Sequence, residues 1–597
     1  MRFKIVIFFI IAVWMVLIGR VYHLSVKSSE FYEEVAMQNA YKSRDIAPTR
    51  GQIFDAKKNP VAINHLGYSI SLAPHLKEEI YIKEIENLGS LFPDLNATIM
   101  QKEYKKQNSA YNQDFIKIAN FIEYDLVVPH FSKLNLNPNL EVLPSSLRHY
   151  PYGKLGSHII GYVGRANARD IEINPLSKLT NIMGRSGVEA YYNNILQGEK
   201  GERTTKVTAL NQVVEEISYT KPISQDIELH IDMELQEYLR DLYSEKAGSV
   251  IIMDVNTGAI IGAGSYPEFD PNPFVTGISS AEWKALIEDL DYPFTNKIVN
   301  GLYPPGSVIK MSMAMAFLNS GKIGRDKTYY CNGGMKLGNH NFRCWKRWGH
   351  GATNMNQAIR ESCDVYFYEG SLEVGIDFLA ANLERHGYGR RTGIDLPNEF
   401  MGTVPSKAWK MEKYGQPWYM GETVNTSIGQ GSFLVSPIQV VKNTAEIASG
   451  KGLTPHFLKS IDGEEVEFKT YEVFTPFEKE QLPYVRRAMY EVANHRNGTA
   501  YKYVNDSVVK IAAKTGTAQV VGIPQNVVVR MKEKDMEYYH RSHAWIVGYA
   551  PYENPKYAVV VLVEHGGGGS SIGGPMLKDI FGKLVDMGYI DLNSTKK

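Results

Sequence analysis

The stretch Tyr303-Pro304-Pro305-Gly306-Ser307-Val308-Ile309-Lys310 stands directly before an apolar run. Two prolines and a glycine break the chain there, so a helix is expected to begin at Ser307. Residues three apart lie on one helix face, which would place the Lys310 amine beside the Ser307 hydroxyl. An amine that accepts the hydroxyl proton makes a serine nucleophilic. The stretch therefore predicts Ser307 as a nucleophile and Lys310 as its general base.

The run after Lys310 is apolar on nearly every side of a helix. It contains Met311, Met313, Met315, Phe317 and Leu318. Such a pattern is typical of a buried, central helix. Taken alone, Ser307 would be interpreted as an ordinary helix N-cap. The rest of the chain has to decide between the two interpretations.

Two further phrases follow in order, Ser362-Cys363-Asp364 and Lys514-Thr515-Gly516-Thr517. A single S-x-x-K arises by chance in a long chain, whereas three such motifs in order seldom do. Ser362 is predicted to shuttle protons between Lys310 and Lys514. Asp364 is predicted to orient Lys310 or a substrate amide. An ionised Asp364 would also raise the pKa of Lys310 and oppose its role as a base.

The Lys514 phrase is expected to be an edge strand along a cleft, where a peptide can add as an extra strand. Gly516 has no side chain, so a ligand backbone can come close. The hydroxyls of Thr515 and Thr517, with Lys514, would hold a terminal carboxylate. The backbone N–H groups of Ser307 and Thr517 would form an oxyanion hole. The alternative is an ordinary exposed strand with a polar edge.

These three motifs are a signature of β-lactamases and penicillin-binding proteins. The chain resembles the class B penicillin-binding proteins over nearly its whole length, and most of all their elongation type, penicillin-binding protein 2. The phrases that carry the resemblance are Arg50–Asp55, Gly184–Glu189, Phe269–Asn272, Gly429–Gly431, His543–Gly548 and, for the elongation type, Cys344–His350. The middle motif usually ends in Asn, and Asp364 stands there. Elongation-type members accept Asp at this place, so the departure supports the subtype.

The resemblance implies a multidomain α+β fold. A membrane-anchored N-terminal pedestal would precede a penicillin-recognising, serine β-lactamase-like transpeptidase domain, whose central antiparallel sheet is flanked by helices. The expected domains are residues 1–25 (tail and transmembrane anchor), 26–225 (a non-catalytic, dimerisation-type pedestal with a head inserted at about 65–165) and 226–597 (the transpeptidase domain). A helix is expected over Ser29–Gln38, where the chain would leave the membrane.

The resemblance also implies a function. The chain would be a peptidoglycan D,D-transpeptidase that crosslinks stem peptides through an acyl-serine intermediate during cell elongation, and β-lactams would acylate it. The alternatives are a septal-type transpeptidase, a β-lactam sensor or β-lactamase, a D,D-carboxypeptidase and a non-catalytic scaffold. No cofactor is required for the chemistry. The implied partners are stem peptides, β-lactam antibiotics, a RodA-type membrane glycosyltransferase and an MreC-type scaffold.

The composition and the N-terminal sequence indicate where in the cell the protein is expected to lie. Lys and Arg total 65 and Asp and Glu total 65, which gives no support for nucleic-acid binding. Ile5 to Gly19 is uncharged, and the run reaches the length of a spanning helix if Arg20 extends to the interface. No small-x-small cleavage site follows, which favours an uncleaved anchor over a signal peptide. We expect a single-pass protein of the inner membrane with its catalytic domain in the periplasm.

The chain has three cysteines, Cys331, Cys344 and Cys363. With His350 they form a pattern of three thiolates and one imidazole, the ligands of a four-coordinate structural zinc. In an oxidising compartment the alternative is a Cys331–Cys344 disulfide with Cys363 free. A third possibility is three plain thiols. We expect a structural zinc that supports the middle motif.

Overall fold

The computed structural model describes residues 2–28, 30–31, 40–112, 114–208, 213–522 and 531–592. Most of the helix predicted over Ser29–Gln38 lies outside the described residues. The chain divides into two compact units. The first comprises Met1–Gly51, Ala166–Ile182 and Asn194–Gln225, and the second comprises Gln52–Arg165, Met183–Asn193 and Asp226–Lys597.

The first unit begins with helix α1 (Arg2–Tyr22), which contains the whole uncharged run. A π-helical turn, His23–Lys27, continues it. Among the described residues, Phe3–Lys27 is the single helical segment long and apolar enough to cross a membrane, and none of it is buried in protein. The unit also holds an antiparallel sheet of β1 (Tyr41–Ile46), β8 (Gly201–Val207) and β9 (Val213–Thr220), and the helices α8 (Ala168–Ile173) and α9 (Leu176–Thr180).

The second unit opens with a hairpin, since β2 (Ile53–Phe54) pairs antiparallel with β3 (Pro60–Leu72). The long strand β3 continues into the predicted head, where it lies between β4 (Ile116–Glu123) and β5 (Leu140–His149). Helices α3 (Glu78–Leu91), α4 (Ala97–Gln107), α5 (Tyr124–Val127) and α6 (Phe131–Asn135) complete the head.

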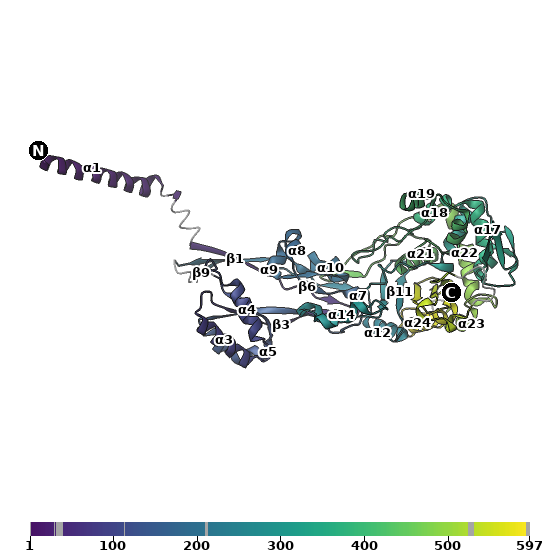
Figure 1. Ribbon diagram of the computed structural model, residues 1–597, viewed down its shortest axis with the longest axis horizontal. Helices are drawn as coiled ribbons and strands as arrows, with labels where there is room; N and C mark the ends of the chain where they lie inside the picture. Colours follow the sequence, from purple (N-terminus) through teal and green to yellow (C-terminus); the bar gives the residue numbers. More distant parts are fainter. Residues whose placement is uncertain are drawn as a thin grey trace. The chain divides into compact units, whose positions relative to one another are not determined.

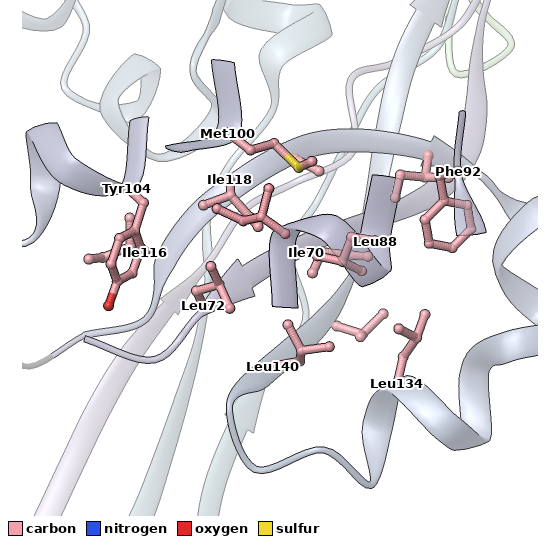
Figure 2. Close-up of a cluster of buried hydrophobic side chains, with 14 of the residues drawn as sticks. Ile70, Leu72, Leu88, Phe92, Met100, Tyr104, Ile116, Ile118, Leu134 and Leu140 are labelled. Atoms are coloured by element: carbon pink, nitrogen blue, oxygen red, sulfur yellow. The ribbon is translucent and has the colours of Figure 1, made fainter. Parts of the chain in front are cut away.

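The head has a hydrophobic core of its own. Figure 2 shows side chains of this core from the strands and the helices, among them Ile70, Leu88, Met100, Ile116 and Leu140. The apolar residues of α3 recur at helical spacing, Tyr81, Ile85 and Leu88, so one face of that helix is buried. The strands and helices between β3 and β5 therefore pack around apolar side chains of their own.

The half of the chain from residue 226 onward is built on a five-stranded sheet in the order β12-β11-β21-β20-β19. Its strands are β11 (Gly248–Asp254), β12 (Ile260–Tyr266), β19 (Ala512–Ala518), β20 (His543–Ala550) and β21 (Tyr557–Val563), and every neighbouring pair is antiparallel. The sheet is buried along almost its whole length, which explains the near-continuous apolar runs. Strand β19 lies at an edge, as predicted for the Lys514 phrase.

Helices cover the faces of this sheet (Figure 1). Gly262 of β12 packs under α12 (Met233–Tyr243), and Gly548 of β20 packs under α24 (Gly574–Asp586). The two glycines belong to one cross-strand row, Gly262–Ile252–Val559–Gly548, so α12 and α24 share a face. Helix α21 (Pro437–Ser449) packs against β11, β20 and β21. The predicted antiparallel sheet with flanking helices is confirmed.

The apolar run after Lys310 is helix α15 (Lys310–Asn319), and Lys310 to Leu318 are all buried. The prediction of a central, buried helix is confirmed. A helical segment begins within one residue of the predicted start at Ser307, but its first turn is not α-helical. Gly306–Ile309 forms a 3₁₀ turn, and the N-cap of that turn is Pro305 rather than Ser307. Gly306 has φ +55°, a left-handed conformation that lets the chain turn sharply before the serine.

Short elements surround the middle motif. Strand β13 (Thr328–Cys331) pairs with β16 (Gly351–Asn354), and β14 (Gly334–Leu337) pairs with β15 (His340–Arg343). Helix α16 (Met355–Arg360) ends just before Ser362, and α17 (Asp364–Val374) begins just after it. The remaining helices of eight or more residues in this half are α14 (Ser280–Glu288), α18 (Ile376–Arg385), α19 (Lys407–Tyr414), α20 (Met420–Ser427) and α22 (Pro476–Asn494).

Candidate active site

A cavity of about 720 Å³ contains residues of all three motifs. It is lined by Ser307 from the first motif, Ser362 and Asp364 from the second, and Thr515, Gly516 and Thr517 from the third. Lys310 and Lys514 are fully buried beside it. The fold therefore brings every predicted catalytic and substrate-binding residue to one place.

The Ser362 hydroxyl lies between the two lysines. Lys310 Nζ donates to Ser362 Oγ at 3.2 Å and to its carbonyl oxygen at 3.0 Å. Lys514 Nζ donates to the same Oγ at 3.0 Å. Ser362 has φ +55°, in the tight connection between α16 and α17. That left-handed backbone is unfavourable for a residue with a side chain, and such strain is concentrated at functional sites.

Asp364 is the first residue of α17, where the N-terminus of a helix favours a negative charge. Its Oδ1 lies 2.7 Å from Lys310 Nζ, and its Oδ2 accepts the Trp345 backbone N–H at 2.9 Å. Burial raises the pKa of the Asp364 carboxyl, and the charge of Lys310 opposes that rise. Of the two roles predicted for Asp364, the contact with Lys310 is the one present in the structure.

Lys514 is held in an environment that disfavours its charge. Burial lowers the pKa of the Lys514 amine well below its usual value, the positive charge of Lys310 lowers it further, and Asp364 acts in the opposite direction. The cluster of two lysines and one carboxylate is uncharged overall when Asp364 is ionised and one amine is neutral. A buried cluster favours that state, because an unpaired buried charge is costly.

Ser307 is half-buried in the cavity wall. Within the part of the chain that the structure describes, its hydroxyl has no hydrogen-bond partner, and Lys310 donates to Ser362 and Asp364 instead. The turn before it is fixed by Gly306 N–H donating to Gly429 O at 2.9 Å. The backbone position of Ser307 is therefore fixed, and its hydroxyl is free to rotate.

Three residues with no predicted role support the motifs. Thr499 Oγ1 lies 2.7 Å from Thr515 Oγ1, and Gln430 Nε2 donates to Thr517 O at 3.2 Å. Trp345 lines the cavity and holds Asp364 through its backbone. Two of them lie in phrases that carry the family resemblance, Gln430 in Gly429–Gly431 and Trp345 in Cys344–His350. Thr499 has no such signal, because only an ordinary Asn497-Gly498 turn signal precedes it.

The predicted metal ligands also come together. One ligand atom each from Cys331, Cys344, His350 and Cys363 lies within 4.8 Å of all the others. His350 Nδ1 lies 3.6 Å from both Cys331 Sγ and Cys344 Sγ. Sulfur ligands 2.3 Å from a tetrahedral zinc lie about 3.8 Å apart, so the cluster fits that ion. All three cysteines are free thiols, so the alternative of a Cys331–Cys344 disulfide is not the arrangement present.

Comparison with known proteins assigns the family. The penicillin binding protein transpeptidase domain matches residues 248–582, and the penicillin-binding protein dimerisation domain matches residues 45–228. The chain is 33% identical to the peptidoglycan D,D-transpeptidase MrdA of Escherichia coli K12 over 94% of this chain and 90% of that protein. This chain belongs to the class B penicillin-binding proteins. MrdA of Haemophilus influenzae is likewise 33% identical, over 95% of this chain and 88% of the relative.

Solved structures of class B penicillin-binding proteins support the same family assignment. Penicillin-binding protein 2 of Helicobacter pylori, in a complex with MreC, is 40% identical with a TM-score of 0.85, covering 92% of this chain and 99% of that one. Penicillin-binding protein 2 of Pseudomonas aeruginosa is 30% identical with a TM-score of 0.69, covering 90% and 96%. The chain is therefore a peptidoglycan D,D-transpeptidase of the elongation type, a serine acyltransferase, and the septal alternative is not favoured.

Proposed function

We propose that Ser307 is the nucleophile of this transpeptidase, Lys310 its general base, and Ser362 the proton relay between Lys310 and Lys514. The observation that carries the proposal is the Ser362 hydroxyl within hydrogen-bond distance of both amines, in the cavity that Ser307 lines. To activate Ser307, the base has to be a neutral amine that accepts the Ser307 hydroxyl proton as that hydroxyl rotates toward it.

The lowered pKa of Lys514 suggests how Lys310 becomes neutral. A proton passes from Lys310 to the Ser362 hydroxyl while Ser362 gives its own proton to the neutral Lys514 amine. Lys310 then accepts the Ser307 proton as Ser307 Oγ attacks the D-Ala-D-Ala carbonyl carbon. The C–N bond breaks, D-Ala leaves as an amine that receives a proton through Ser362, and an acyl-serine ester remains. Asp364 keeps Lys310 oriented through this exchange.

The substrate would lie along edge strand β19. We assign the Ser307 and Thr517 backbone N–H groups to the oxyanion hole, and the Thr515 and Thr517 hydroxyls with Lys514 to the terminal carboxylate of the stem peptide. Gly516 leaves room for the peptide backbone. β-Lactams, which mimic this carboxylate and amide, would acylate the same serine.

We further propose a structural zinc held by Cys331, Cys344, His350 and Cys363. The donor set and its mutual distances support it. Zinc would supply four bonds that tie Cys363, inside the middle motif, to the strand end at Cys331 and the loop at Cys344. The Asp364 backbone N–H already faces Cys344 Sγ at 3.4 Å, so the metal would fix the start of α17.

The chain is proposed to be anchored in the inner membrane by α1, with the catalytic half in the periplasm, where stem peptides lie. The proposed domains are residues 1–25, 26–225 with a head at about 65–165, and 226–597. A RodA-type glycosyltransferase and an MreC-type scaffold are the proposed partners. The Helicobacter pylori relative solved with MreC supports the second of them.

Labelling with a fluorescent penicillin tests the proposal. The wild type is expected to retain the label covalently, and Ser307→Ala is expected to lose it. Ser280→Ala is the matched control, because Ser280 is exposed on α14 and lies outside the cavity. Labelling that survives Ser307→Ala would assign the nucleophile to another residue.

A further inference from the structure

The roles proposed above leave one charged group of the cavity unexplained, the carboxylate of Glu533. Among the described residues that line the cavity, the carboxylates are Asp364 and Glu533. Asp364 is committed to Lys310 at 2.7 Å. Glu533 takes no part in forming the acyl-serine. The reaction has a second substrate, however, whose reacting group is an amine.

Glu533 is oriented by neutral donors. Its Oε2 accepts the Ser542 backbone N–H at 2.9 Å, and its Oε1 accepts the Ser542 hydroxyl at 2.8 Å. Ser542 is buried and directly precedes strand β20, so it is a rigid support. A carboxylate has about four acceptor positions, and two remain after these bonds. In the part of the chain that the structure describes, no cation lies within ion-pair distance of Glu533, so its charge is fixed in place without being neutralised.

A glycine turn holds the Glu533 side chain beside the substrate strand. A Cβ on Gly567, which has φ +82°, would lie 3.0 Å from Glu533 Cβ, and the Gly567 N–H donates to Ser542 O at 2.7 Å. Two residues later, a Cβ on Gly569 would lie 2.1 Å from Gly516 O. One turn of the chain therefore packs against both the Glu533 side-chain stem and the strand that carries the proposed oxyanion hole. Only glycine permits both contacts.

We propose that Glu533 binds the ammonium group of the acceptor stem peptide. The proposal rests on the acyl-serine mechanism above and adds the recognition of the second substrate. A primary amine is protonated near neutral pH, so the acceptor arrives as a cation. Hydrogen bonds between an ammonium and a carboxylate are about twice as strong as neutral ones. A preoriented, unpaired carboxylate in the cleft is complementary to that cation.

The bound ammonium releases one proton to solvent and becomes a neutral amine. Its nitrogen lone pair then attacks the ester carbon of acyl-Ser307, and a C–N bond forms. The C–O bond to Ser307 breaks, and the second proton of the nitrogen ends on Ser307 Oγ. Glu533 thus positions the nitrogen and raises its local concentration, and it takes no proton in the step.

The test separates the two half-reactions in Glu533→Gln, which keeps the side-chain size and removes the charge. Acylation by a fluorescent penicillin reports the first half. The second half is measured with a purified stem pentapeptide as donor and a stem tetrapeptide, which lacks the terminal D-Ala, as acceptor. Hydroxylamine, an uncharged nucleophile near neutral pH, serves as a second acceptor. The matched control is Glu537→Gln, because Glu537 belongs to the same loop but pairs with His540 and lies outside the cavity.

We expect Glu533→Gln to raise the KM for the tetrapeptide about tenfold or more, with acylation and hydroxylamine-dependent turnover unchanged within about twofold. Glu533→Asp should recover part of the loss, and Glu537→Gln should behave as wild type. An unchanged tetrapeptide KM would overturn the inference while leaving the Ser307 mechanism intact. Loss of penicillin acylation in both Glu533 variants would overturn it too, because Glu533 would then act in the first half-reaction or in folding. If Ser307→Ala is the only variant that loses acylation, that result concerns the proposed function and does not concern the role of Glu533.

Discussion

At the scale of single residues, the chemistry depends on which buried amine is neutral. Ser362 Oγ contacts both lysines, and Asp364 contacts only Lys310. Burial lowers the pKa of the Lys514 amine, the positive charge of Lys310 lowers it further, and Asp364 opposes both effects. The sequence predicted Lys310 as the general base, a role that needs a neutral amine. In the mechanism we propose, the relay through Ser362 makes the Lys310 amine neutral.

The pH dependence of acylation should report Lys514. Because burial lowers its pKa, Lys514 is neutral above that pKa and protonated below it, so acylation of the wild type should slow as the pH falls through it. Lys514→Arg keeps a positive charge at all pH values. For Lys514→Arg we expect an acylation rate that is lower by about 100-fold or more and that does not decline further as the pH falls. Stopped-flow measurement of penicillin acylation between pH 5 and 10 would show this.

The control is Lys510→Arg, an exposed residue just before β19. Lys510→Arg should retain both the wild-type acylation rate and the decline of that rate as the pH falls. A Lys514→Arg enzyme with the wild-type pH profile would remove Lys514 from the proton path.

At the scale of elements, strand β19 and the turn before α15 fit tightly. A Cβ on Gly516 would lie 2.9 Å from Val308 Cγ1 and 3.2 Å from Pro305 O. Gly516→Ala should therefore push the strand away from the nucleophile turn. We expect a stability loss of about 1–3 kcal/mol and at least tenfold slower acylation. Chemical denaturation and penicillin acylation measure the two effects.

Gly582→Ala in α24 is the control, since a Cβ there meets no atom within 4 Å. It should leave acylation unchanged, and alanine favours the helix. Wild-type acylation by Gly516→Ala would show that the close fit is not required.

The proposed zinc belongs to the same scale, because its ligands join short elements around the start of α17. Protein purified without chelators is expected to contain about one zinc per chain. Cys331→Ser should lower both the zinc content and the melting temperature, since a structural metal contributes folding energy. His340→Ala, on strand β15 outside the cluster, should not lower the zinc content. Metal analysis that returns well under one zinc per wild-type chain would refute the site.

At the scale of the whole molecule, much of the catalytic half follows from sequence patterns. The central antiparallel sheet and the edge position of the Lys514 strand were predicted, and the three motifs line one cavity as expected. The 3₁₀ form of the turn before α15 was not predicted, because Gly306 adopts φ +55° and the chain tightens there, which no periodicity signals.

Glu533 shows why the rest could not be predicted. It stands in the charged run Lys532-Glu533-Lys534-Asp535, a pattern typical of a solvated surface. Its position in the cavity depends on Ser542 and on the glycine turn near Gly567, which are brought to it only by the pairing of β20 with β19 and β21. Information of that kind belongs to the folded chain rather than to any local stretch of sequence.

The central claim is that three motifs far apart in the chain meet around one attacking oxygen. Mass spectrometry of peptides from the penicillin-treated protein tests it most directly. The account predicts one β-lactam adduct per chain, carried by the peptide that contains Ser307, and none in the Ser307→Ala protein. An adduct on the peptide that contains Ser362, or on any other peptide in place of the Ser307 peptide, would contradict it.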